Sequence, residues 1–420
     1  MKRALVFGCL GAGLCTAAAS GQALSQDPSV DATSGNASGP VAYVYVSARV
    51  GATNRTEIRA YAAAPNGHLA LVQGSPFAGD VTFMAVNGLY VFGAGTAGTY
   101  VNAYSIGPDG ALSYAAASNV VQPSNGACDS PGALVFDHTG ATLYNLDEFA
   151  TACTNAAYQG FAVQKSNGRL DLVNEAEVGV TGSILSFVGS NKFAYGADCV
   201  KSSPRIYGFA RNGDGSLKSL NLNFAFPLAP ANQNWCPQTL AADTTNHLAV
   251  PMVPLAGPTG QNGPAQLATY TAQNDGTLIT SSTYTNMPKV AVGDVTAISM
   301  APSGKLLAVA GAGGLQLFRF NGADPITPYT GLIIRQEVAQ LFWDNNDHLY
   351  AISQSAAKLW VFTVTTTGYS VAPGSPYSIN DPQNIAVQPL PLPWSTAEAH
   401  AAKHPVQAAA AAPTTFASIQ

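Results

Sequence analysis

Hydrophobic and polar residues alternate along this chain in a pattern that returns seven times. Each copy is fifteen residues long and consists of an alternating apolar segment, a polar turn and a second apolar segment. The tenth position is glycine in six copies, and the fourth is aromatic in six. Such alternation around an Asn-Gly or Asp-Gly turn is typical of a β-hairpin, where glycine adopts the positive φ that the turn requires. The copies cover residues 58–72, 101–115, 159–173, 206–220, 267–281, 315–329 and 359–373.

A second pattern fills the intervals between these hairpins. It reads strand, polar turn, strand, and together with the following hairpin it predicts a unit of four antiparallel strands, A to D. The hairpins recur every 43 to 61 residues, which is the spacing of propeller blades. Complete copies of the second pattern occur at residues 81–93, 132–146, 183–196, 238–251, 296–309 and 339–352.

Two single strands remain, one at each end of the patterned region. Residues 41–48 precede the first hairpin and residues 384–389 follow the last. We expect the second of these to be strand A of the first blade and the N-terminal segment to supply strands B, C and D. That arrangement closes the ring and removes its open sheet edges. The predicted fold is therefore all-β, a seven-bladed β-propeller of four-stranded antiparallel blades.

The N-terminal segment has the features of an export signal. Lys2 and Arg3 precede an apolar core of eleven residues, and small residues follow. Cleavage after Ala19 or after Ala23 fits this pattern. The apolar core is too short to span a membrane. A lipid anchor at Cys15 is an alternative that the leucine immediately before it disfavours.

These features predict a secreted or periplasmic protein in four parts. They are a signal peptide at residues 1–23, a disordered linker at 24–40, the propeller at 41–389 and a disordered Pro- and Ala-rich tail at 390–420. Without the two basic residues of the signal, 16 basic residues face 23 acidic ones, a net charge near −7. Nucleic acid is therefore not an expected partner. We expect a monomer without a membrane span.

Four cysteines remain after the signal, an even number that suits an oxidising compartment. Cys128 falls in the loop that enters the third blade, and Cys153 falls in the B-to-C loop of that blade. Cys199 falls in the next B-to-C loop, and Cys236 in the loop that enters the fifth blade. Both classes of loop emerge on one face, so we expect the disulfides Cys128–Cys153 and Cys199–Cys236. Other pairings and unpaired thiols remain alternatives.

The strand pattern, with a Gly-Ser-Pro-aromatic segment at residues 74–77 echoed at 374–377, resembles the lactonase-type seven-bladed propellers. That family includes bacterial 6-phosphogluconolactonases and fungal muconate cycloisomerases. The resemblance covers residues 41–389 and implies a site on the top face of the ring. The Gly-Ser-Pro-aromatic segments themselves are most simply turns that follow strand D.

The catalytic pattern of the family is largely missing from this chain. Active members resemble one another in a histidine at the start of an early strand A, a Gly-Pro-Arg-His segment and a glutamate that ends a strand B. Residues 130–133 and 180–183 open the third and fourth blades here, and they contain neither histidine nor arginine. Asp198 is the only matching carboxylate. The resemblance therefore leaves the activity unassigned.

Candidate site residues come from the loops of the top face. Carboxylates and arginines around a central funnel suit acid–base chemistry or the binding of a polar ligand. Solvated loop charges and pairs between blades are equally consistent with the same residues. The catalytic candidates are Asp147, Glu148, Asp198 and Arg335. The ligand-binding candidates are Arg49, Arg205, Trp235, Asp294, Glu337 and Gln354.

Two further motifs have structural explanations, so we expect no metal and no cofactor. Residues 344–348 resemble a calcium loop but fall in an A-to-B turn and lack the remaining ligands. His400 and His404 have a zinc-like spacing in the low-complexity tail, without a third ligand.

Two functional classes remain after these exclusions. The favoured one is an exported propeller that binds a small molecule, a glycan or a protein. The alternative is a metal-independent hydrolase or isomerase acting on a lactone or cyclic ester. A carboxylate and an arginine that converge in the funnel would favour the enzyme. A funnel lined by aromatic and amide side chains would favour binding.

Overall fold

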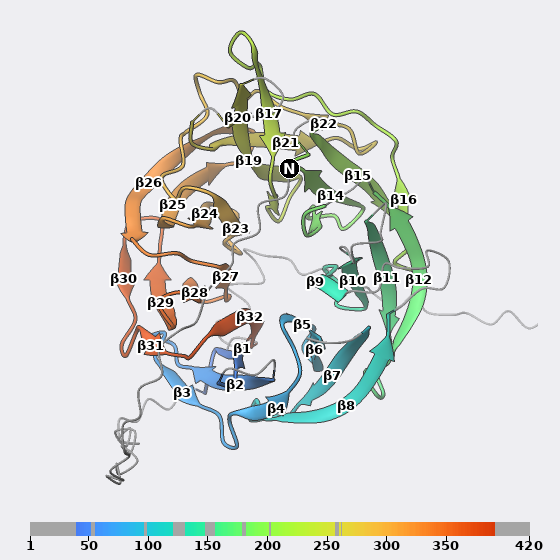
Figure 1. The fold of residues 1–420 in the computed structure, drawn as a ribbon, viewed down its shortest axis with the longest axis vertical. Coiled ribbons are helices and arrows are strands. Elements are labelled where there is room, and N and C mark those ends of the chain that lie inside the picture. The colour runs from blue at the N-terminus through green and yellow to red at the C-terminus, as the bar shows by residue number, and fades with distance from the viewer. Residues whose placement is uncertain are drawn as a thin grey trace, which may run out of the picture. The chain divides into compact units, whose positions relative to one another are not determined.

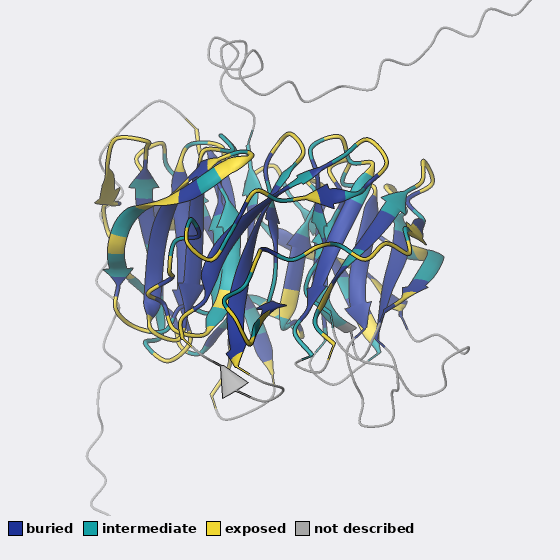
Figure 2. Ribbon diagram, turned by 90° about the horizontal axis from the view of Figure 1, so that it is seen from above, coloured by how far each residue is buried: buried dark blue, intermediate teal, exposed yellow. Residues whose placement is uncertain are grey.

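A computed structural model of the chain describes residues 39–51, 55–95, 99–120, 131–147, 156–178, 182–200, 203–256, 260–261 and 263–390. Within these ranges the chain forms strands and turns. Seven antiparallel sheets stand around a common centre (Figure 1), which confirms the seven-bladed propeller. Seen from the side, buried residues fill the middle of the blades and exposed residues gather at the turns (Figure 2).

Each blade is built on four main strands that run outward from A to D. The second to fourth blades contain β5 (Phe83–Val86), β6 (Tyr90–Ala94), β7 (Tyr100–Ile106) and β8 (Leu112–Asn119); β9 (Pro131–Phe136), β10 (Thr142–Asp147), β11 (Ala157–Val163) and β12 (Leu170–Glu177); and β13 (Ser186–Phe187), β14 (Phe193–Asp198), β15 (Arg205–Arg211) and β16 (Leu217–Ser219). The sixth and seventh contain β23 (Val295–Met300), β24 (Leu306–Gly311), β25 (Gly314–Asn321) and β26 (Asp324–Ile334); and β27 (Gln340–Trp343), β28 (His348–Ser353), β29 (Lys358–Val364), β30 (Tyr369–Val371) and β31 (Tyr377–Ser378).

The first blade joins the two ends of the patterned region, as expected. Its strands are β32 (Pro382–Pro389), β1 (Ala42–Arg49), β2 (Thr56–Ala63), β3 (Leu69–Leu71) and β4 (Phe77–Gly79). Strand β32 lies antiparallel to β1, with Val44 opposite Val387. The C-terminal strand is therefore strand A of this blade.

The fifth blade differs from the prediction on its inner side. It contains β17 (Gln233–Pro237), β18 (Ala241–Ala242), β19 (His247–Ala256), β20 (Gly260–Gln261), β21 (Gln266–Ala272) and β22 (Leu278–Ile279). Cys236 and Trp235 lie in β17, which pairs with the long strand β19, and not in a loop as predicted. The reason is that β19 extends four residues beyond its pairing with β21, so its inner edge recruits the segment before strand A.

The hydrophobic core consists of seven clusters of buried residues, one at each interface between neighbouring blades. Tyrosines on the second strand of several blades connect these interfaces by donating a hydrogen bond to a backbone oxygen in the hairpin turn of the next blade. The donor–acceptor distances are 3.1 Å for Tyr45 to Gly110, 3.0 Å for Tyr90 to Lys165, 2.6 Å for Tyr144 to Gly215 and 2.9 Å for Tyr195 to Gly276. The repeat is therefore visible in the contacts between blades as well as within them.

This packing explains most of the repeated glycines. Five of the six tenth-position glycines have a positive φ, namely Gly67, Gly110, Gly168, Gly215 and Gly276. A Cβ atom at each of these would also press on a side chain, which for Gly110 is the ring of Tyr43 and for Gly168 is that of Tyr90. Gly368 has neither property, since nothing lies within 4 Å of its Cβ position. In the sixth blade, where the tenth residue is Asp324, the positive φ occurs at Gly322.

Among the described residues there is no helix of the length and apolar character needed to cross a membrane.

Candidate functional site

The innermost strands of all seven blades surround a cavity of about 530 Å³ at the centre of the ring. Every blade contributes residues from strand A or from the segment just before it. The lining residues are 83–86, 133–136, 183–184, 238–239, 295–298, 340–342 and 384–385. A central funnel was expected from the predicted propeller, and this cavity lies at the centre of the ring.

The wall of the cavity mixes polar and apolar side chains. The polar lining residues are Ser183, Gln238, Thr239, Thr296, Gln340 and Asn384. The other described lining residues, such as Phe83, Phe136, Ile298 and Phe342, are apolar. The channel is therefore mostly apolar, with amides and hydroxyls interspersed.

Some of these polar groups already have protein partners, whereas one does not. Asn384 Oδ1 accepts a hydrogen bond from the backbone nitrogen of Met84 at 3.0 Å. Gln238 Oε1 is buried and has no hydrogen-bond partner among the described residues. A buried acceptor without a donor costs about 1–3 kcal/mol. A donor on a bound molecule would remove this cost.

No ionisable side chain is among the described residues that line the central cavity. The convergence of a carboxylate and an arginine that would indicate acid–base chemistry is thus not found in this lining. Sequence reasoning did not select Gln238, Gln340 or Asn384. The available signal was a polar residue near the start of strand A in three different blades.

The predicted carboxylates Asp147 and Asp198 end strands β10 and β14, the second strands of two adjacent blades. Both side chains are buried. Asp198 accepts hydrogen bonds from the backbone nitrogen of Val200 and from the hydroxyl of Tyr207, each at 3.0 Å. Tyr207 belongs to the next strand outward, and Asp198 is not among the residues that line the central cavity. Glu148 lies outside the described residues.

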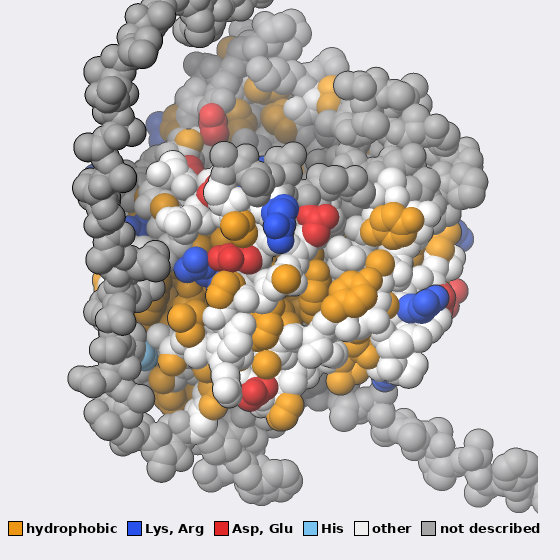
Figure 3. Space-filling view, turned by 60° about the horizontal axis from the view of Figure 1, so that its bottom comes forward, with side chains coloured by type: hydrophobic (Ala, Val, Ile, Leu, Met, Phe, Trp, Pro, Cys, Tyr) orange, Lys and Arg blue, Asp and Glu red, His pale blue; other side chains and the backbone are white. Residues whose placement is uncertain are grey.

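Arg49 and Gln354 meet at one acidic residue where the ring closes. Asp381 precedes β32, and its carboxylate lies 3.8 Å from the guanidinium of Arg49. Gln354 Nε2 donates to Asp381 Oδ1 at 2.7 Å. These contacts connect the first and seventh blades. Figure 3 shows one face of the ring, on which acidic side chains lie next to Lys or Arg and hydrophobic side chains gather toward the middle.

Three further candidates lie on the sixth and seventh blades, outside the cavity lining. Asp294 and Arg335 are exposed, one just before β23 and the other just after β26. Glu337 accepts hydrogen bonds from the hydroxyls of Ser353 at 3.0 Å and Ser355 at 2.8 Å. Its carboxylate thus fixes the loop that follows β28.

The remaining two candidates belong to the fourth and fifth blades. Arg205 is exposed at the start of β15, with its guanidinium 5.6 Å from the ring centre of Tyr207. Trp235 is 1% exposed in β17, and its ring centre lies 6.2 Å from that of Tyr284. Trp235 therefore packs within the blade, while Arg205 lies at the surface.

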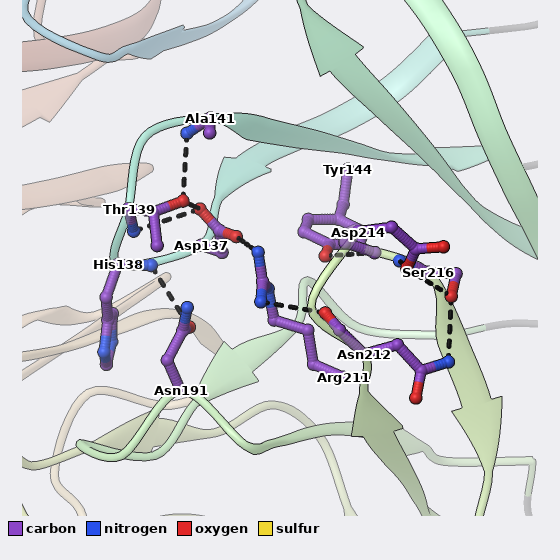
Figure 4. Close-up of polar contacts among 11 residues, drawn as sticks. Asp137, His138, Thr139, Ala141, Tyr144, Asn191, Arg211, Asn212, Asp214 and Ser216 are labelled. Atoms are coloured by element: carbon purple, nitrogen blue, oxygen red, sulfur yellow. Dashed lines mark hydrogen bonds and ion pairs between the residues drawn. The ribbon is translucent and has the colours of Figure 1, made fainter. Parts of the chain in front are cut away.

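A buried ion pair joins the third and fourth blades at the rim that carries the A-to-B turns (Figure 4). Asp137, between β9 and β10, pairs with Arg211 at the end of β15, and both side chains are largely buried. Asp137 Oδ1 also accepts from Thr139, at 3.1 Å from its nitrogen and 2.7 Å from its hydroxyl. Burial raises the pKa of the neighbouring Tyr144 to about 12. Removal of either charge would leave the other buried and uncompensated, so this pair holds the two blades together.

The expected disulfide between Cys199 and Cys236 is present and connects the fourth blade to β17 of the fifth. The other expected pair, Cys128 and Cys153, lies outside the described residues. No group of three or more His, Cys, Asp or Glu side chains with the geometry of a metal site occurs in the described part of the chain.

Comparison with known proteins identifies relatives by fold and not by sequence. No protein-family model and no curated protein sequence matches the chain. A periplasmic gluconolactonase of Pseudomonas aeruginosa is similar in structure, with a TM-score of 0.62, 13% identity and coverage of 83% of this chain and 99% of that one. Candidate 6-phosphogluconolactonases of Bacteroides uniformis and Bacteroides fragilis give TM-scores of 0.60 and 0.59 with 13% and 12% identity. They cover 83% and 82% of this chain and 100% and 97% of their own. The resemblance to lactonase-type propellers is confirmed at the level of the fold, which is a seven-bladed propeller.

Proposed function

We propose that this protein is an exported propeller that binds a small, neutral, amphipathic molecule in its central channel. The observation that carries the proposal is the lining of the channel, in which amides and hydroxyls lie among apolar side chains, with no ionisable group among its described residues. Small-molecule sites are typically concave and mostly apolar, with a few polar groups that fix the orientation of the ligand.

The channel size and its polar groups define the ligand further. About 530 Å³ is within the usual range for a small-molecule site. The acceptor on Gln238 favours a ligand with a hydrogen-bond donor, such as a hydroxyl or an amide. A charged ligand would lose its hydration without gaining a counter-ion, which is strongly unfavourable.

Export is part of the proposal and rests on three features. The first 23 residues have the composition of a signal peptide. The Cys199–Cys236 disulfide suits an oxidising compartment. A protein of the same fold, the gluconolactonase of Pseudomonas aeruginosa, is described as periplasmic.

The test is a screen of the oxidised protein against neutral and charged small molecules, with thermal stabilisation as the first measurement and calorimetry as the second. Gln238→Leu and Gln340→Leu each remove an amide from the channel lining, and Gln354→Ala, outside the lining, is the matched control. We expect a neutral ligand to bind the control normally and the channel variants at least ~tenfold more weakly. Stabilisation by charged compounds alone, or equal binding by all variants, would contradict the proposal.

Lactone hydrolysis is the second candidate, favoured by the two buried aspartates at equivalent strand ends of adjacent blades and by the fold of the gluconolactonases. Incubation with glucono-δ-lactone, followed by acid release, tests it. Turnover that disappears in Asp147→Asn or Asp198→Asn would establish an enzyme. Binding of the lactone without acid release would support the binding function.

A further inference from the structure

A second cavity of about 580 Å³ lies on the fourth blade, outside the central channel. Its walls are the beginning of β15, the segment that follows β16, and the end of β12 in the third blade. Arg205 and Tyr207 come from β15, Asn223 and Phe224 come from the segment after β16, and Glu177 comes from β12. None of these residues lines the central cavity.

Nearly all residues that line this cavity belong to the segment that the Cys199–Cys236 disulfide closes. Every lining residue except Glu177 and Val178 lies between the two cysteines. The disulfide holds both ends of this segment, one beside β14 and the other in β17. The cavity is therefore built almost entirely by one covalently closed segment, which limits how far its walls can separate.

Phe224 anchors the second wall against the blade. Its ring centre lies 5.9 Å from that of Tyr195 in β14. The same ring passes over Gly208, where a Cβ atom would come within 2.7 Å of Phe224. Only glycine permits this approach, so the sequence of β15 accommodates the aromatic side chain. The cavity thus has an aromatic wall that is fixed in place.

The polar groups of the cavity combine donors and acceptors and carry opposite charges. Arg205 has five N–H donors, of which one nitrogen contacts Ser203 Oγ at 3.2 Å. Glu177 provides acceptors on another wall, and no ion pair between Glu177 and Arg205 forms in the structure. Asn223 is exposed and supplies both a donor and an acceptor. The charges of the site sum to zero, while its hydrogen-bonding capacity is high.

We propose that this cavity is a second binding site and that its ligand is a neutral saccharide. A sugar hydroxyl both donates and accepts hydrogen bonds, and a mixture of guanidinium, carboxylate and amide groups satisfies both roles. The C–H face of a sugar ring packs against aromatic side chains such as Tyr207 and Phe224. Glu177 would repel an anionic ligand that Arg205 attracts, and the reverse holds for a cationic one, so the net charge of the site favours neither.

Saturation-transfer NMR and calorimetry with glucose, galactose, N-acetylglucosamine, cellobiose and chitobiose test this site in the oxidised full chain. We expect at least one of them to bind with a Kd of ~1 mM or below. Arg205→Ala and Asn223→Ala are expected to weaken that binding at least tenfold. The matched control is Lys218→Ala, which removes an exposed positive charge from the neighbouring strand β16 without touching the cavity lining. Circular dichroism verifies that each variant is folded.

A second control separates this site from the channel. Gln238→Leu is expected to bind the saccharide as the wild type does, whatever its effect on channel ligands. The proposal is overturned if none of the five saccharides binds. It is also overturned if binding survives in Arg205→Ala and Asn223→Ala, or if it is lost in Gln238→Leu or Lys218→Ala.

Discussion

Substitution of two glycines at the same position of the repeat should have opposite effects on stability. Gly110 and Gly368 are both the tenth residue of their hairpin copies, and the sequence treats them as equivalent. In the structure Gly110 has a φ of +83° and its missing Cβ would collide with the ring of Tyr43. Gly368 has a φ outside the left-handed range and has open space around it.

The expected magnitudes follow from these two environments. Gly110→Ala adds a methyl group to a packed interface, which costs about 1–3 kcal/mol, and holds alanine in the left-handed region, which costs about 1–2 kcal/mol more. Gly368→Ala reduces the freedom of the unfolded chain without strain and should stabilise the protein by about 0.4–1 kcal/mol. The two variants should therefore differ by roughly 2–6 kcal/mol in free energy of unfolding, combining these contributions.

Equilibrium unfolding in urea, followed by circular dichroism on the oxidised protein, measures this difference directly. Gly110→Ala should lower the transition midpoint and Gly368→Ala should leave it unchanged or raise it slightly. Equal destabilisation by both substitutions would show that the hairpin turn, and not contact with the neighbouring blade, determines the requirement for glycine. A neutral Gly110→Ala would refute the packing argument altogether.

Three further predictions concern the cross-link, the hydrogen bonds between blades and the buried tyrosines. Replacing Cys199 and Cys236 together by serine opens a loop with a sequence separation of 37; chain entropy predicts a loss of about 4 kcal/mol in the same urea assay, and an unchanged midpoint would contradict it. Tyr195→Phe removes a hydroxyl that donates at 2.9 Å to the next blade; we expect a loss of about 1 kcal/mol, and no loss would mean that this bond contributes nothing to stability. Burial raises the pKa of Tyr144 from its ordinary 10.0 to about 12. The unfolded chain therefore releases this proton at a lower pH than the folded protein does. The contribution of Tyr144 to stability should be constant below pH 10 and fall between about pH 10 and 12. Phenolate absorbance checks this, and full ionisation of the tyrosines near pH 10 in the folded protein would argue against it.

The fold could be predicted from the sequence because local patterning specifies it repeatedly. Seven hairpin signals and six interval signals constrain the same architecture, and the two single strands left only one way to close the ring. The inner side of the fifth blade could not be predicted in this way. The segment at 233–237 has no repeat counterpart, and its pairing with β19 depends on the length of a strand more than ten residues further along.

The site was harder to predict because the type of a residue says little about which way its side chain points. Charged residues were selected as candidates, but Asp198 is held by the hydroxyl of Tyr207, and Arg49 by the carboxylate of Asp381. The channel is lined instead by uncharged residues such as Gln238. Which strand residues face the axis depends on the tilt and pairing of each blade, and these are tertiary properties.

The pairing of β32 with β1 also sets the order in which the chain can finish folding. During synthesis, strand β1 emerges early, while its inner partner β32 is among the last residues of the ring to appear. Six blades can assemble from neighbouring segments, but the first must wait with one edge uncovered, where another chain could attach. The ring is therefore complete only in a chain that includes β32. A translation product that stops before β32 leaves the edge of β1 unpaired. Proteases or chaperones can distinguish such a product from the finished molecule.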